Sequence, residues 1–271
     1  MSEVLKLLFL GDIVGSPGRK AVVDFLPKAK KEWGLDFIVV NGENSAAGKG
    51  ITPKIAIELM RAGATVITTG DHVWDQRELT EFLKDEPRVL RPLNYEARTP
   101  GSGSIVLETP KGKVGVMQLQ GRTFMQPPLQ NPFYHGPKEA KRMREEGVKA
   151  IFCDFHAEAT SEKIAFTRCM DGLASGVVGT HTHVQTADEQ IFPGGTAHLT
   201  DGGMCGPDNS VLGRDITSVV WRFENSMPTR FPIAKGPVRL CGAIIEIDME
   251  TGKALKIERV SELIPEENSE A

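Results

Sequence analysis

The stretch VLKLLFLGD at residues 4–12 joins an apolar run to an abrupt polar end. A short apolar run bounded by glycine predicts a buried β-strand over Val4–Leu10, with Asp12 just beyond the end of the strand. The same order recurs at four further predicted strands, which span Phe37–Val40, Thr65–Thr68, Ala150–Asp154 and Gly176–Val178. This repeated unit of buried strand and polar loop decides the fold class.

Amphipathic stretches between these strands predict helices. They span Arg19–Trp33, Lys54–Ala62, Asp75–Leu83 and Pro137–Gly147. Strands that alternate with helices indicate a largely parallel sheet covered on both faces. Turn residues also predict three hairpins, which pair Gly103–Glu108 with Lys113–Leu119, Gln190–Phe192 with Thr196–Thr200, and Val238–Asp248 with Ala254–Val260. The expected fold is therefore α/β with a mixed sheet, or with two sheets packed face to face under outer helices.

Length, composition and charge exclude several classes of protein. The 271 residues are 40% hydrophobic and 25% charged, as in ordinary soluble domains. The net charge of −4 argues against a surface that binds duplex nucleic acid. The four cysteines form no CxxC pair, so buried free thiols are expected and structural zinc is not. We expect one domain over residues 1–264 and a frayed acidic tail over residues 265–271.

The N-terminal apolar run is too short for a signal peptide or a membrane span. It ends at Asp12, after only a few apolar residues. We therefore expect a cytoplasmic protein that has no membrane partner.

Each of the five predicted strands is followed by side chains that can bind a metal. These are three carboxylates and four histidines: Asp12, Glu43, Asp71, His72, His156, His181 and His183. Since loops at the carboxyl ends of parallel strands meet in one crevice, these residues should be neighbours in space. They offer more ligands than one ion needs, which predicts two divalent cations that share a carboxylate.

Other interpretations of single residues stand beside this one. Asp12 alone also fits a helix cap, whereas His181 and His183, two apart in an extended stretch, share one face and can reach one metal. His135 and His198 are expected to be structural. Residues 120–136, rich in proline and aromatics, predict an ordered loop that either covers a site or simply packs.

The ordered set of motifs resembles the calcineurin-like metallophosphoesterases, and more narrowly the YmdB-like subgroup. The motifs are Gly11-Asp12-Ile-Val-Gly15, Asn41-Gly-Glu43-Asn44, Thr69-Gly-Asp71-His72-Val-Trp74-Asp75, Asp154-Phe-His156 and Gly179-Thr-His181-Thr-His183. The resemblance implies a four-layer α/β/β/α sandwich of the metallophosphatase type with mixed sheets. It also implies a dinuclear centre of iron or manganese, with zinc or cobalt as alternatives, and hydrolysis of small phosphodiesters such as 2′,3′-cyclic nucleotides.

Carried over to this chain, the resemblance implies two sets of ligands. One metal would be held by Asp12, Glu43, Asn44 and His183, and the second by Glu43, Asp71, His156 and His181. Asn44 is also expected to contact the substrate. Relatives usually carry asparagine at the position of Asp71, and the added negative charge is expected to tighten divalent binding and to reduce the positive potential at the phosphate.

The expected reaction is attack of a metal-bridging hydroxide on phosphorus, with His72 as the general acid. His72 follows the ligand Asp71 and is not itself needed as a ligand.

Three alternatives stay open at this point. One is a phosphomonoesterase with the same site, another is a non-catalytic regulator that binds a nucleotide or a protein, and the third is an amidohydrolase. The last is disfavoured because its His-x-His pair lies on the first strand of a barrel, whereas here the pair begins at His181. A homo-oligomer is also left open.

Overall fold

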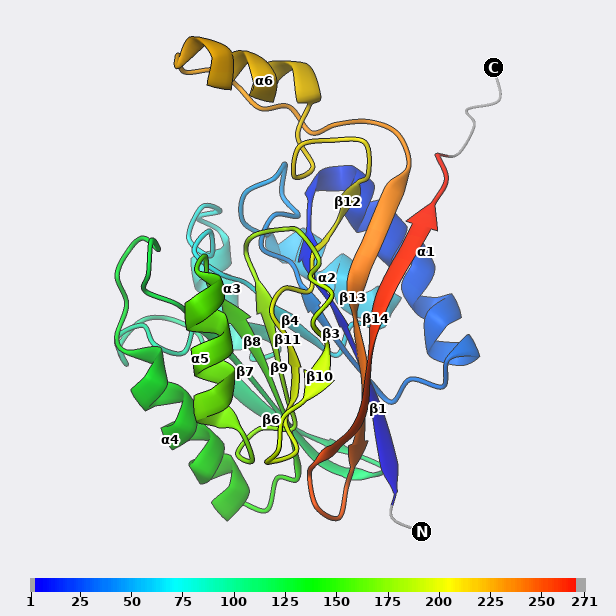
Figure 1. Cartoon of the computed structure of the whole chain (residues 1–271), viewed down its shortest axis with the longest axis vertical. Coiled ribbons are helices and arrows are strands. Elements are labelled where there is room, and N and C mark those ends of the chain that lie inside the picture. Colours follow the sequence, from blue (N-terminus) through cyan, green and yellow to red (C-terminus); the bar gives the residue numbers. More distant parts are fainter. Residues whose placement is uncertain (1–2, 267–271) are drawn as a thin grey trace.

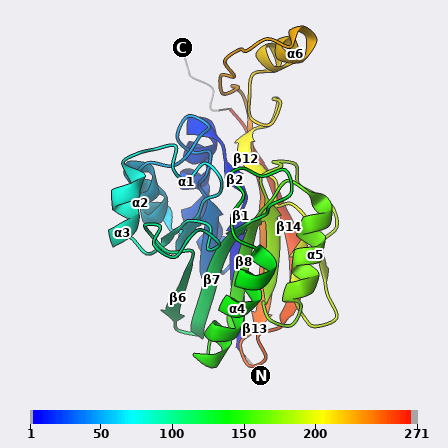
Figure 2. The ribbon, with the colours of Figure 1, turned by 90° about the vertical axis from the view of Figure 1, so that its left-hand side faces the viewer.

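The computed structural model describes residues 3–266, and in it two β-sheets stack face to face with helices on both outer faces (Figure 1). Figure 2 shows α1, α2 and α3 on one side of the strands and α5 on the other. This is the four-layer α/β/β/α sandwich with mixed sheets that the resemblance implies, so the predicted fold class is confirmed.

The first sheet has eight strands in the order β2-β12-β13-β1-β3-β4-β5, with β14 paired to β13. Its strands are β1 Val4–Leu10, β2 Asp12–Ile13, β3 Phe37–Asn41, β4 Val66–Thr68, β5 Val89–Leu90, β12 Met204–Pro207, β13 Val238–Asp248 and β14 Ala254–Ile264. Strands β1, β3, β4 and β5 run parallel, while β13 is antiparallel to β1.

The second sheet has six strands in the order β10-β11-β9-β8-β7-β6. Its strands are β6 Ser104–Thr109, β7 Gly112–Gln120, β8 Ala150–His156, β9 Gly176–Thr180, β10 Gln190–Ile191 and β11 Ala197–Leu199. Strands β7, β8, β9 and β11 run parallel, and hairpins add the outer strands β6 and β10.

Three clusters of buried apolar side chains hold the layers together. One lies between the sheets, where Phe9 of β1 contacts Phe152 of β8 with a ring separation of 5.0 Å. The second packs the first sheet against α1 Gly15–Glu32, α2 Pro53–Ala62 and α3 Leu79–Asp85. The third packs the other sheet against α4 Pro132–Glu145 and α5 Thr160–Met170. Burial of both faces explains why the core strands read as continuous apolar runs.

The structure corrects the starts of three predicted helices. The first helix begins at Gly15 and not at Arg19. The third helix begins at Leu79 and not at Asp75, because the Asp75 carboxylate bonds to the ring of His72 while residues 72–78 form turns. Residues 132–136 belong to α4 and not to a loop, because Asn131 caps the helix and Pro132 starts it. The sequence analysis predicts neither α5 nor α6, which spans Ile216–Asn225. Of the expected tail, residues 265 and 266 are exposed and 267–271 lie outside the described residues.

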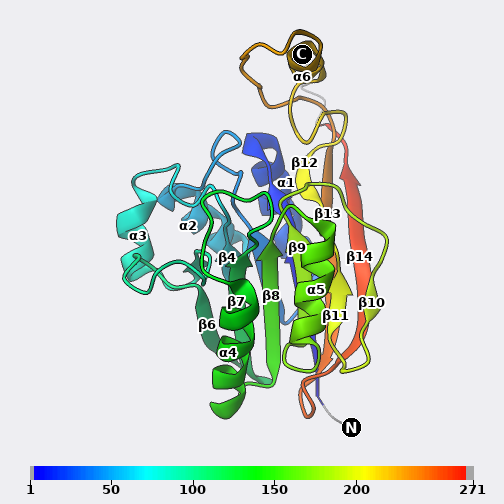
Figure 3. The same ribbon diagram turned by 60° about the vertical axis from the view of Figure 1, so that its left-hand side comes forward.

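Residues 211–231, called the arm below, extend away from the sandwich and carry α6 (Figure 3). Asp215 caps the helix by accepting a hydrogen bond from the backbone amide of Ser218. Val219 is the one buried residue of α6, so this helix packs little against the two sheets.

Candidate metal centre

The predicted site residues meet where the two sheets abut, at the carboxyl ends of their parallel strands. The loops after β1, β3 and β4 come from the first sheet, and those after β8 and β9 come from the second. His156 ends β8 and His181 follows β9, so these two histidines approach the carboxylates from the opposite sheet. The expected convergence is confirmed, although the sequence did not assign the strands to two sheets.

A tight group of carboxylates and imidazoles forms the centre of this site. The Nε2 atom of His156 lies 2.7 Å from Oε2 of Glu43 and 3.0 Å from Oδ1 of Asp71. The Nδ1 atom of His181 lies 3.3 Å from the same Asp71 oxygen. Asp12, Glu43 and His156 are almost completely buried. Burial of so many ionisable groups requires compensation by opposite charge.

The donor set fits a metal ion. Three overlapping groups of residues place ligand atoms within 4.8 Å of one another: Asp71, His156 and His181; Asp12, Glu43 and His156; and Glu43, Asp71 and His72. At this site, Oδ1 of Asp12 and Nδ1 of His183 are buried without a hydrogen-bond partner among the described residues. Mixed imidazole and carboxylate ligands suit transition metals such as iron, manganese, cobalt and zinc.

A contact between two ring nitrogens supports the same conclusion. Nδ1 of His181 lies 3.0 Å from Nε2 of His156. Two neutral nitrogen lone pairs repel one another at this distance, so either a proton or a cation must lie between or beside them. Both nitrogens also face the Asp71 carboxylate, which makes this a favourable place for positive charge.

The pKa shifts of Asp71 and His156 show that this pocket favours positive charge. Burial by itself would raise the pKa of Asp71, but hydrogen bonds with His156 and His181 lower that pKa far below its usual range. Burial opposes a charge on His156, yet the carboxylates of Glu43, Asp71 and Asp12 raise the pKa of its ring well above the usual value.

His183 and Asn44 lie next to this group. Nε2 of His183 is 3.2 Å from Oδ1 of Asn44, and the backbone amide of His181 donates to Oδ2 of Asp12 at 3.1 Å. Both histidines have positive φ angles, 94° for His181 and 65° for His183. Residues other than glycine rarely adopt a positive φ angle, and they keep it where the surrounding contacts enforce it.

Gly70 must be glycine for a steric reason. A Cβ atom at this position would lie 2.1 Å from Oε2 of Glu43 and 2.5 Å from Nε2 of His156. The β4 loop therefore approaches the ligand atoms at a point where any larger residue would displace them.

The His72 side chain lies at the edge of the group with its own partner. Its Nδ1 atom lies 3.1 Å from Oδ2 of Asp75, and its backbone amide donates to Oε1 of Glu43 at 2.8 Å. The contact with Asp75 leaves Nε2 available for another group. The motif that contains Asp75 was noted in the sequence, but its partnership with His72 required the turn over residues 72–75.

A buried network behind His156 was not predicted. Asp154, on β8, accepts hydrogen bonds from Asn41, Thr68 and Thr180 at 2.9, 2.5 and 2.7 Å. The Thr180 hydroxyl also lies 2.9 Å from Nδ1 of His156 and so fixes the orientation of that ring. Burial raises the pKa of Asp154 to about 7. The sequence signal for this network was the carboxylate of Asp154 within the apolar strand Ala150–His156.

A buried ion pair supports the loop between the two histidines. Nζ of Lys163 lies 2.6 Å from Oδ2 of Asp201, and both side chains are almost wholly buried. The same Asp201 oxygen accepts from the hydroxyl of Thr182 at 2.5 Å, and Lys163 donates to that hydroxyl at 3.2 Å. Thr182 separates His181 from His183, so this pair anchors the loop that carries both rings.

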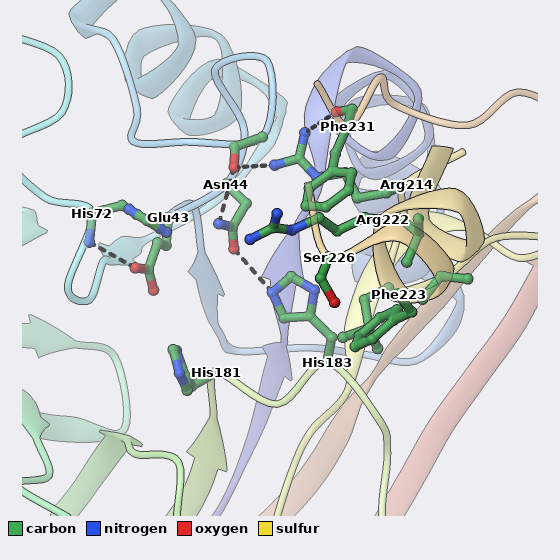
Figure 4. Close-up of a pocket in the computed structure, with 14 residues that line it drawn as sticks. Glu43, Asn44, His72, His181, His183, Arg214, Arg222, Phe223, Ser226 and Phe231 are labelled. Carbon is green, nitrogen blue, oxygen red and sulfur yellow. Dashed lines mark hydrogen bonds between the residues drawn. The ribbon is translucent and has the colours of Figure 1, made fainter. Parts of the chain in front are cut away.

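A cavity of about 680 Å³ opens beside the metal-binding group (Figure 4). One wall carries Glu43, Asn44, His72, His181 and His183, and the arm supplies the opposite wall, including Arg214, Arg222, Phe223 and Phe231. Residues 120–136 do not line this cavity. The loop considered from the sequence as a cover over the site therefore does not cover this cavity. The sequence signal for the arm was an unassigned apolar and basic stretch, Val219-Val-Trp-Arg-Phe223, just after the capping residue Asp215.

The histidines expected to be structural lie outside this cavity. His198 is buried between Thr167 and Thr200, with ring nitrogens 2.9 and 3.1 Å from their hydroxyls. His135 lies in α4. Cys205 is buried, as expected, and burial raises the pKa of its thiol.

Comparison with known proteins places the chain in a family. A family model described as YmdB-like protein matches residues 8–260. The chain belongs to this YmdB-like family. A protein of Bacillus subtilis (strain 168) named 2′,3′-cyclic-nucleotide 2′-phosphodiesterase is 48% identical over 259 residues, which cover 94% of this chain and 96% of the relative.

Solved structures of two relatives share the architecture of the YmdB-like chain. A novel phosphatase from Mycoplasma pneumoniae has a TM-score of 0.91 at 34% identity, covering 98% of this chain and 96% of the other. A hypothetical protein from Thermus thermophilus has a TM-score of 0.89 at 36% identity, covering 96% of this chain and 100% of the other. The family resemblance inferred from the motifs is confirmed.

Among residues 3–266, no helix has both the length and the apolar character needed to cross a membrane. The cytoplasmic location and the homo-oligomer considered from the sequence stay predictions.

Proposed function

We propose that this chain is a metal-dependent phosphodiesterase that hydrolyses small phosphodiesters, and 2′,3′-cyclic nucleotides in particular. The observation that carries the proposal is the group formed by buried Asp12, Glu43 and His156 with half-buried Asp71 and His181, whose ligand atoms face one another beside an open cavity. The 48% identical relative from Bacillus subtilis, named as a 2′,3′-cyclic-nucleotide 2′-phosphodiesterase, supports the choice of substrate.

Two sets of residues would hold two divalent cations, with iron or manganese proposed. Asp12, Glu43, Asn44 and His183 would form one set, and Glu43, Asp71, His156 and His181 the other. When bound, the cations would supply Lewis acidity toward the phosphate and a nucleophile at neutral pH. Buried Glu43 is common to the two sets, because its carboxylate lies within 4.8 Å of ligand atoms of Asp12 in one group and of Asp71 in another.

His72 is proposed as the general acid. Its Nδ1 atom is held by Asp75, so Nε2 is the atom from which a proton would pass to the leaving ribose oxygen. His72 lines the cavity, where its ring can reach a substrate. Asp75 acts through His72 and is a positioning residue.

The test compares the metal content and the turnover of two variants. His72→Asn is expected to keep the metal and to lower hydrolysis of 2′,3′-cyclic AMP by about 10²- to 10⁴-fold, the range expected on loss of an acid catalyst. Glu43→Gln is expected to lose both metal and turnover. His135→Asn, outside the cavity, is the control. Equal metal loss in the His72 and Glu43 variants would make His72 a ligand and remove its role as acid.

A phosphomonoesterase is the second candidate, favoured by the solved relative described as a phosphatase. Adenosine 3′-monophosphate and 2′,3′-cyclic AMP, offered to the same manganese-loaded protein, distinguish the two activities. Bound metal with no turnover of either ester would refute both and favour a regulator.

A further inference from the structure

The arm brings cationic and aromatic side chains to the cavity wall that faces the metal-binding group. In Figure 4, the Arg222 side chain extends from α6 into the space beside Asn44 and His183. Phe223 and Phe231 line the same cavity with 81% and 40% of their surface exposed. Ligand pockets are lined mainly by apolar and aromatic side chains, so these exposed rings offer a binding surface on this wall.

The two arginines of this wall have different surroundings. Arg214 donates to the backbone oxygen of Gly48 at 2.7 Å and to that of Phe231 at 3.1 Å. It therefore ties the arm to the loop that carries Glu43 and Asn44. The guanidinium of Arg222 has no hydrogen-bond or ion-pair partner within residues 3–266, so its donors are free to meet a ligand.

The cavity is larger than a phosphate group requires. Its volume of about 680 Å³ lies within the range of about 300–1,000 Å³ that accommodates whole small-molecule ligands. The metal-binding residues occupy one wall, and the exposed rings stand on the other. A substrate whose phosphate lies at the metal-binding group would extend toward the arm.

We infer that the arm recognises the substrate: Phe223, with Phe231 beside the cavity, stacks on a nucleobase, and Arg222 donates hydrogen bonds to the anionic phosphate. The inference rests on the proposed function for the position of the reacting phosphate. Stacking suits any base because every base offers a π face, and an arginine fork matches phosphate oxygens. The substrate class is thereby narrowed to nucleotide diesters over diesters without a base.

The experiment measures kcat/KM for two substrates that differ only in the base. These are 2′,3′-cyclic AMP and methyl ribofuranoside 2′,3′-cyclic phosphate. We expect Phe223→Ala to lower kcat/KM about tenfold for the nucleotide, through KM, and to leave the base-free ester unchanged. Arg222→Met is expected to lower both about tenfold or more, with partial recovery in Arg222→Lys. Arg230→Met, an exposed arginine of the same arm, is the control.

Calorimetry supplies a readout that does not depend on turnover. Adenosine 3′-monophosphate should bind more tightly than inorganic phosphate, and Phe223→Ala should remove that advantage without weakening phosphate binding. If the wild type binds in this way but hydrolyses neither ester, the proposed function is wrong and the inference stands. If the wild type hydrolyses 2′,3′-cyclic AMP and Phe223→Ala changes neither selectivity nor binding, the inference is wrong.

A third result also overturns the inference. In this result, the Phe223→Ala protein sediments as a smaller oligomer than the wild type, and its selectivity for the nucleotide over the base-free ester is unchanged. The exposed ring would then serve a contact between copies of the chain.

Discussion

Breaking the buried Lys163–Asp201 pair should destabilise the protein and loosen the metal site together. The substitution Asp201→Asn removes the negative charge and leaves the Lys163 ammonium buried. The Thr182 hydroxyl, at 3.2 Å, is then the other group to which Lys163 donates a hydrogen bond. Removal of one partner of a buried pair costs about 3–5 kcal/mol, because the other charge stays desolvated. A cost of this size is a large part of the total of about 5–15 kcal/mol that folded domains possess.

The control is a surface pair with nearly the same N–O separation. Lys84 and Glu81 lie 2.7 Å apart, compared with 2.6 Å for the buried pair, but their side chains are 50% and 77% exposed. Glu81→Gln should cost about 1 kcal/mol or less, since solvent screens exposed pairs. Urea unfolding in EDTA, followed by circular dichroism, measures both variants without a contribution from bound metal.

The same pair should affect metal binding because Asp201 accepts hydrogen bonds from Thr182, between His181 and His183. We expect manganese affinity of Asp201→Asn to fall about 10- to 100-fold, the range seen when partners of metal ligands are removed. If Asp201→Asn loses no more stability than Glu81→Gln and keeps the wild-type affinity for manganese, the reasoning is wrong.

Three further outcomes are expected. Asp71→Asn should weaken manganese binding, measured by titration calorimetry, because it removes a carboxylate that lies within 3.3 Å of both His156 and His181; unchanged affinity would contradict its role as a ligand. Asp75→Asn should lower kcat about tenfold while metal analysis shows full occupancy, because the His72 ring loses its charged partner; metal loss would assign Asp75 to the metal site instead. One thiol per folded chain should react rapidly with Ellman's reagent and none in Cys169→Ser, because Cys169 is exposed whereas burial raises the pKa values of Cys153, Cys205 and Cys241; rapid reaction of the Cys169→Ser protein would show that the core opens.

Much of the fold could be predicted because its signals are local. The strand predicted over Val4–Leu10 coincides with β1, and the long C-terminal hairpin lies where its turn residues indicate. A strand that is buried on both faces consists of a continuous run of apolar residues, and glycine and aspartate follow at its end. The sequence alone therefore determined the strand and loop units, and with them the residues that could become ligands.

The tertiary structure decided which of these residues meet and what supports them. The backbone amide of His181 bonds to Asp12 across 169 positions, and Arg214 bonds to Gly48 across 166. Neither contact leaves a periodic trace in the sequence, because each depends on how the two sheets and the arm pack. The Lys163–Asp201 pair, the hydrogen bonds of Asp154 and the cavity wall formed by α6 arise in the same way. Local patterns specify elements, whereas the geometry of the site comes from packing between distant segments.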